Sequence, residues 1–178
     1  MPGQDGQSNR TKAILTAIGK HRDEAQAEGQ HFTTLTDAGI DEKIKGQKPL
    51  IVWQSWTPSV TVGNTLICDV GLANPGPTKH ANLFATMTVG FPAVTQTPHP
   101  PGLDPRTSMT DARFPRLTLP RFEGLPLEPG EVRSLRFAMT TPGSVDRSNY
   151  FASIVLIQAA WHGQGDHLDQ SLFIFEVV

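Results

Sequence analysis

The segment NTLICDVGLANPGP, residues 64–77, has the alternation that decides the fold of this chain. Large apolar side chains occupy every second position, as in a β-strand that buries one face and exposes the other. The Asn-Pro-Gly sequence that follows is typical of a turn and ends the strand. We therefore expect a strand whose buried face consists of Leu66, Cys68, Val70 and Leu72.

Five other segments share this character, because they are enriched in β-branched and aromatic residues and are bounded by Gly, Pro, Asn or Asp. No helical periodicity separates them, so the strands should connect directly to one another. The pattern predicts an all-β fold, an immunoglobulin-like antiparallel β-sandwich of about seven strands. The five segments are residues 50–56, 80–91, 131–139, 149–161 and 171–178.

Residues 1–46 differ in composition and are predicted to form an N-terminal arm that begins with a polar tail and contains a short helix. Helix formers dominate residues 11–28, and a thin apolar stripe runs along one face. Because short helices are marginal in water, we expect this helix to be ordered only by contact with another surface. The contact residues would be Ile14, Leu15 and Ile18. The sandwich should occupy residues 50–178, with a Pro-rich insertion at 92–120 that is too long for a simple hairpin loop.

The composition excludes several classes of function. The 178 residues carry a formal net charge of -2, so neither nucleic acid nor an anionic membrane surface is an expected partner. No apolar run approaches the roughly 20 residues that span a bilayer, and no secretory signal peptide is recognisable, so we expect neither a membrane span nor an export address. Cys68 is the single cysteine, which excludes an internal disulfide and predicts a buried, unreactive thiol.

Three segments within residues 50–178 resemble the bacterial immunoglobulin-like domains of the cell-adhesion-related (CARDB) type: LICDVGLANPGPT, LPLEPGEVRSLRF and NYFASIVL. In that family one strand ends in an Asn-x-Gly turn, and a Leu-x-Pro-Gly-Glu turn starts a later strand that ends in Phe. The resemblance implies an adhesion, spacer or assembly module without catalytic residues. The matching residues are Asn74, Pro75, Gly76, Leu127, Glu128, Pro129, Gly130, Glu131 and Phe137.

The segment WHGQGDHLD, residues 161–169, contains two histidines and two aspartates and is predicted to be a loop between two strands. In an immunoglobulin-like sandwich this loop lies at the same end as residues 74–80. Three imidazoles and a carboxylate would suit zinc or another transition metal, whereas the simpler interpretation is a set of solvated loop histidines. The candidate metal ligands are His80, His162, Asp166 and His167.

The last two predicted strands are apolar on both faces, unlike a sheet with one solvated side. Their outer faces would form one apolar patch, and a patch of this kind marks an interaction site when nothing covers it. The cover could be the N-terminal helix, another subunit, or the apolar residues of the insertion. Those are Val94, Leu103, Met109 and Phe114. The patch is predicted to include Phe151, Val155, Ile157, Phe173 and Phe175.

Two functional hypotheses remain open. The first is a non-catalytic structural or interaction module that builds or decorates a larger assembly, with a protein partner or a second copy, through the outer face of the later strands and the arm. The second is a module that binds a sugar, peptide or metal at the loops carrying His80, His162 and His167. An enzyme or a cofactor is not expected, because neither a Gly-x-Ser-x-Gly element nor a phosphate-binding glycine motif is present.

Overall fold

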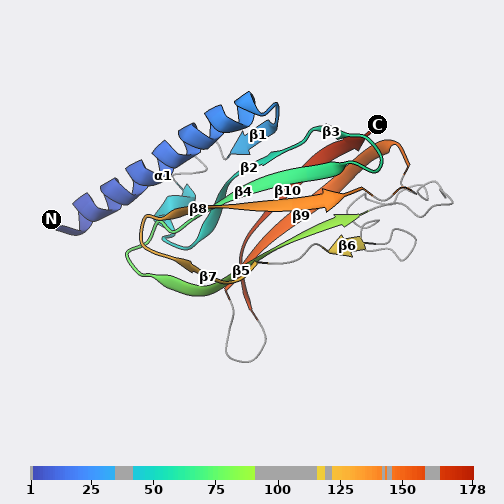
Figure 1. Cartoon of the computed structure of the whole chain (residues 1–178). Helices are drawn as coiled ribbons and strands as arrows, with labels where there is room; N and C mark the ends of the chain where they lie inside the picture. Colours follow the sequence, from blue (N-terminus) through green and yellow to red (C-terminus); the bar gives the residue numbers. More distant parts are fainter. Residues whose placement is uncertain are drawn as a thin grey trace.

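The computed structural model describes residues 2–34, 42–90, 116–118, 122–141, 143, 146–158 and 165–178. In these residues a long helix, α1 (Pro2–Ala27), lies outside two packed sheets (Figure 1). Sheet A has the order β1 (His31–Thr34), β2 (Leu50–Trp56), β4 (Thr65–Ala73) and β8 (Val132–Thr140). Sheet B has the order β3 (Ser59–Val60), β10 (Asp166–Val177), β9 (Ser148–Gln158), β5 (His80–Gly90) and β6 (Arg116–Thr118), with β7 (Phe122–Leu127) also paired with β5.

The predicted all-β sandwich is confirmed, and the six predicted segments are β2, β4, β5, β8, β9 and β10. It is not wholly antiparallel, because β3 pairs with β10 in parallel. β2 pairs with β4 in sheet A, and the chain then crosses to sheet B after Pro58, where β3 pairs with β10. The segment from β2 to β3 therefore contributes a strand to each sheet. The short strands β1, β3 and β6 escaped prediction because two to four residues are too few to show alternation.

The core lies between the two sheets. Leu66, Cys68, Val70 and Leu72 form the inner face of β4, as predicted, and all four are fully buried. They share one apolar cluster with the inner face of β9, which begins with Tyr150. The Tyr150 hydroxyl donates to the carbonyl oxygen of Asp146 at 2.6 Å, a contact of the same kind as the tyrosine corner of immunoglobulin-like folds.

Asn74 joins the two turns that carry the sequence resemblance. Its buried side-chain amide donates to the carbonyl oxygen of Leu127 at 3.1 Å, and its side-chain oxygen accepts from the Gly76 N–H at 3.1 Å. Its backbone accepts from the Gly130 N–H at 2.7 Å and donates to the Glu131 carbonyl oxygen at 3.1 Å. The Asn-Pro-Gly turn after β4 is therefore fastened to the turn between β7 and β8.

Side chains of β2 close one edge of sheet B. The Gln54 amide donates to the carbonyl oxygen of Leu172 at 2.7 Å, and the Trp56 indole N–H donates to that of Ile174 at 2.9 Å. These bonds satisfy backbone groups of β10 that would otherwise be free to pair with another strand. This stretch of β10 is therefore closed to a further strand.

The helix α1 packs on the outer face of sheet A. Ile14 and Ile18 are buried in a cluster with Val52 and Trp53 of β2, which confirms that the arm contacts another surface. The prediction for Leu15 is wrong, because this side chain points away from the sheet and is 45% exposed. The helix also begins at Pro2, within the segment predicted as a tail. Arg10 holds this first part in place, since its Nε donates to the carbonyl oxygen of Pro75 at 2.9 Å.

The indole ring of Trp53 lies against the backbone of Gly71 in β4. A Cβ atom added at Gly71 would stand 2.3 Å from Trp53 Cδ2, so this position excludes a side chain. On the other side of the indole, the imidazole of His21 stacks with a centroid distance of 4.5 Å and an angle of 18° between the planes. Gly71, Trp53 and His21 thus form a three-layer contact that joins β4, β2 and α1.

Replacing Gly71 by Ala is expected to lower the free energy of unfolding by about 1–3 kcal/mol, because the methyl group must displace the indole. Gly19→Ala is the matched control: nothing lies within 4 Å of an added Cβ on α1, and the helix should gain about 1 kcal/mol. Urea unfolding measures both variants. A Gly71→Ala protein as stable as the wild type would contradict the described packing.

Replacing Asn74 by Ala is expected to cost about 2–4 kcal/mol of stability, because it leaves the buried Leu127 carbonyl and its own turn without their donors and acceptors. Asn149→Ala provides the control at an exposed position of β9, where the change should stay within about 0.5 kcal/mol. Thermal unfolding of the two variants gives the comparison. Equal losses at both positions would show that Asn74 has no special role.

Candidate functional site

The structure describes three of the four predicted metal ligands: His80, Asp166 and His167. His80 starts β5, and its Nδ1 lies 3.3 Å from the side-chain oxygen of Gln158 in β9. Gln158 is in turn the cross-strand partner of Asp166. His167 is exposed on β10, and His162 lies outside the described residues. Within the described part of the chain, no three His, Cys, Asp or Glu side chains are close enough to hold a metal ion. The metal site therefore stays a prediction.

The outer face of sheet B is apolar along β9 and β10. Phe151, Val155 and Ile157 lie there and are half-buried, in agreement with the face predicted for them. Ile174 is the cross-strand partner of Phe151, so it shares this face. Ile174 is 50% exposed, and Leu172, two residues before it, is 39% exposed.

The prediction that Phe173 and Phe175 belong to the same outer face is wrong. Both are buried in the core between the sheets, where Phe173 packs on Trp56 at a centroid distance of 4.9 Å and Phe175 on Tyr150 at 5.9 Å. The error arises because both faces of this strand are apolar. Alternation separates its residues into two sets but does not say which set faces inward. The register with β9 decides it.

The helix α1 packs on sheet A, against β1, β2 and β8, and not on this outer face. The arm residues Ile14 and Ile18 are buried against sheet A instead. The apolar residues of the insertion lie outside the described residues. These are Val94, Leu103, Met109 and Phe114. Leu172 and Ile174 are therefore exposed on this face in the described part of the chain.

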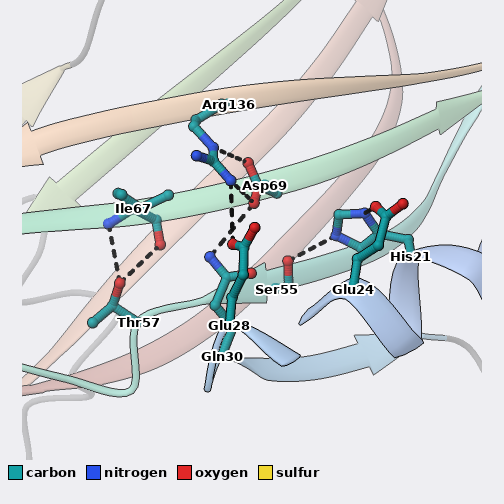
Figure 2. Close-up of polar contacts among 9 residues, drawn as sticks. All are labelled: His21, Glu24, Glu28, Gln30, Ser55, Thr57, Ile67, Asp69 and Arg136. Carbon is teal, nitrogen blue, oxygen red and sulfur yellow. Dashed lines mark hydrogen bonds and ion pairs between the residues drawn. The ribbon is translucent and has the colours of Figure 1, made fainter. Parts of the chain in front are cut away.

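A buried polar contact links α1 to sheet A (Figure 2). The Nε2 atom of His21 lies 2.9 Å from the hydroxyl oxygen of Ser55, which is fully buried in β2. The carboxylate of Glu24, one helical turn further along α1, lies 3.8 Å from His21 Nδ1. Sequence analysis did not identify this contact, because its residues are far apart in the chain and follow no motif.

A bidentate ion pair continues this contact toward β8. Arg136 donates from Nε and Nη2 to the two oxygens of Asp69 at 2.7 and 3.0 Å, and from Nη2 to Glu28, directly after α1, at 3.4 Å (Figure 2). The hydrogen bonds to Asp69 raise the pKa of Arg136. The Gln30 amide also donates to Asp69, at 3.4 Å. These residues line a pocket of about 210 Å³ between the helix and the sheet and hold the end of α1 in place.

The hydroxyl of Ser55, the imidazole of His21 and the carboxylate of Glu24 contact one another in the order of a nucleophile, a general base and an orienting carboxylate. The hydroxyl of Ser55 is nevertheless fully buried beneath α1, so a substrate has no access to it. Cys68 is buried in the core, and burial raises the pKa of its thiol, which keeps the thiol protonated. Both groups therefore serve packing. In the described residues, no helix is both long enough and apolar enough to cross a bilayer.

No protein-family model matches this chain, and no curated protein matches it. Several solved structures are similar in fold at low sequence identity. The sporulation control protein Spo0M from Bacillus subtilis shares 11% identity at a TM-score of 0.42, over 73% of this chain and 49% of that protein, so this chain spans about half its length. The C-terminal domain of Wzt shares 11% identity at 0.48, over 84% and 78%. A CARDB domain from Pyrococcus furiosus shares 13% identity at 0.45, over 74% and 93%.

The protonation of His21 is coupled to the docking of α1. Burial lowers the pKa of His21 below its usual value of 6.5. The carboxylates of Asp69, Glu24 and Glu28 oppose this shift, and the guanidinium of Arg136 adds to it. A lowered pKa in the docked state means that the undocked helix binds a proton more readily, so acid favours undocking.

The stability that docking contributes is therefore expected to be complete above about pH 7.5 and to decrease as the pH falls through the ordinary pKa of 6.5 toward the lowered one. Urea unfolding of the wild type and His21→Gln over a pH series measures this. The difference between them should shrink as the pH falls. His167→Gln, at an exposed position, is the control and should show no such trend. A wild-type advantage independent of pH would exclude the coupling.

Proposed function

We propose that this chain is a non-catalytic interaction module that associates with a second copy of itself through the outer face of sheet B. The observation that carries the proposal is the exposure of Leu172 and Ile174 on a regular sheet face. A solvated face normally carries polar side chains at such positions. Exposed aliphatic side chains in a contiguous row are typical of a contact surface.

The chemistry of this face suits a second copy. Glu176 is exposed at one end of the outward row of β10, opposite Asn149. The outward positions in the middle of the two strands carry apolar or uncharged polar side chains. They are Phe151, Ser153, Val155 and Ile157 on β9, and Gln170, Leu172 and Ile174 on β10. Two such faces can pack about 10 Å apart, as sheets do within a sandwich, with Glu176 at the rim of the contact. The face is therefore complementary to itself.

The sequence predicts that the arm takes part in the contact with a partner, whereas its buried residues contact the module's own sheet. Its buried stripe, with Ile14 and Ile18, stabilises sheet A within the same chain. The exposed Leu15 leaves the opposite side of α1 as a separate surface. Docking of the helix against the module's own sheet favours a compact unit that associates through sheet B, with no exchange of the arm between copies.

Replacing Leu172 and Ile174 together by Thr is expected to weaken self-association by roughly tenfold or more. Each substitution removes aliphatic surface that the contact between the two copies would bury, while the β-branched Thr side chain suits a strand. Sedimentation equilibrium or light scattering over a concentration series measures the association. Both side chains are exposed, so the free energy of unfolding should change by less than about 1 kcal/mol.

Leu15→Gln is the matched control, since it removes an exposed leucine from α1 and leaves sheet B intact. It should associate as the wild type does. A wild type that stays monomeric at every concentration excludes the second copy as the partner. If Leu15→Gln dissociates and the double variant does not, the contact lies on the helix.

A further inference from the structure

Among the described residues, the edge of sheet A at β1 is open. The chain leaves α1 at Gly29, which has a φ of 72°, and begins β1 two residues later beside the C-terminal end of the helix (Figure 1). β1 pairs with β2 on one side, and no described strand pairs with it on the other. An edge of this kind presents unpaired backbone N–H and carbonyl groups. It contrasts with β10, whose carbonyl groups accept from side chains of β2.

A groove of about 520 Å³ wraps around this edge. Phe32 lines it from the side of α1, where it packs against the helix–sheet cluster. His31 lines it from the opposite side, with its ring edge-on to Trp56 at 5.7 Å. Successive side chains of a strand point to opposite faces, so a groove lined by both runs across the strand edge itself. A smaller hollow of about 180 Å³ adjoins it at Thr33 and Thr34.

One charged group in the groove has no carboxylate partner among the described residues. The guanidinium of Arg22 lies 5.3 Å above the ring of Phe32, and among the described residues no carboxylate pairs with it. In the part of the chain that the structure describes, the groove therefore offers an unpaired cation beside an open strand edge.

We propose that the free edge of β1 binds an extended peptide segment of a partner protein, which adds a strand to sheet A and places an acidic side chain against Arg22. Backbone hydrogen bonds along the edge provide affinity in strand addition, and pockets on either side select alternate side chains. The two hollows flanking β1 supply such pockets, and Arg22 supplies the charge preference. This surface is separate from the outer face of sheet B.

The first test uses a phage-displayed library of random linear peptides, selected on the full chain. Enriched peptides should be rich in β-branched residues and share an Asp or Glu. A synthetic copy of an enriched peptide should bind Arg22→Glu roughly tenfold or more weakly than the wild type. Arg22→Lys should retain most of the affinity. Lys20→Glu, an equal charge reversal at an exposed position of α1 outside the groove, should bind as the wild type does.

Strand addition has its own signature. N-methylation of alternate residues of the selected peptide should abolish binding in one of the two alternating patterns and spare it in the other, because every second amide faces the edge. Hydrogen exchange should show new protection within His31–Thr34. Failure to enrich any peptide, equal binding by Arg22→Glu, or equal binding of the two N-methylated forms would each overturn the proposal. The Leu172 and Ile174 double variant should bind the peptide normally.

Discussion

The contact of the Trp53 indole with the backbone of Gly71 is the constraint on which the outer layer of this protein depends. The missing side chain lets a large aromatic ring lie against the sheet, and the ring then offers a flat surface to His21 of α1. The Nε2 atom of His21 forms a hydrogen bond with the Ser55 hydroxyl, and its Nδ1 atom lies near the carboxylate of Glu24. Helix docking thus rests on a stacked apolar contact supplemented by a buried hydrogen bond.

Coverage by α1 explains why β2 is buried along its whole length. Its outer face packs under the helix, its inner face joins the core, and its polar side chains close the edge of β10. Because β2 makes all three contacts, none of its side chains faces solvent. Within the part of the chain that the structure describes, the same arrangement leaves two other surfaces uncovered: the outer face of sheet B at Ile174 and the edge of β1. The surfaces available for binding follow from where the helix lies.

The thiol of Cys68, the hydroxyl of Ser55 and the carboxylate of Asp69 serve packing. Cys68 lies in the core, and the Ser55 hydroxyl lies beneath α1, so neither is accessible to a substrate. Asp69 is paired with Arg136 and fastens the end of α1 to β4 and β8. These groups therefore fasten the helix and the strands of sheet A to one another.

The amino-acid sequence was enough to locate the strands with clear alternation and to identify the inward face of β4, because Leu66, Cys68, Val70 and Leu72 oppose a face that contains Thr65 and Asp69. It also determined that the arm needs a surface, since its apolar stripe is thin. Only the tertiary structure decided that Phe173 and Phe175 face inward, because both faces of β10 are apolar and the register with β9 selects between them. It also decided that α1 covers sheet A, because the stacking of His21 on Trp53 and the ion pair of Arg136 join residues far apart in the chain, and local periodicity carries no information about such contacts.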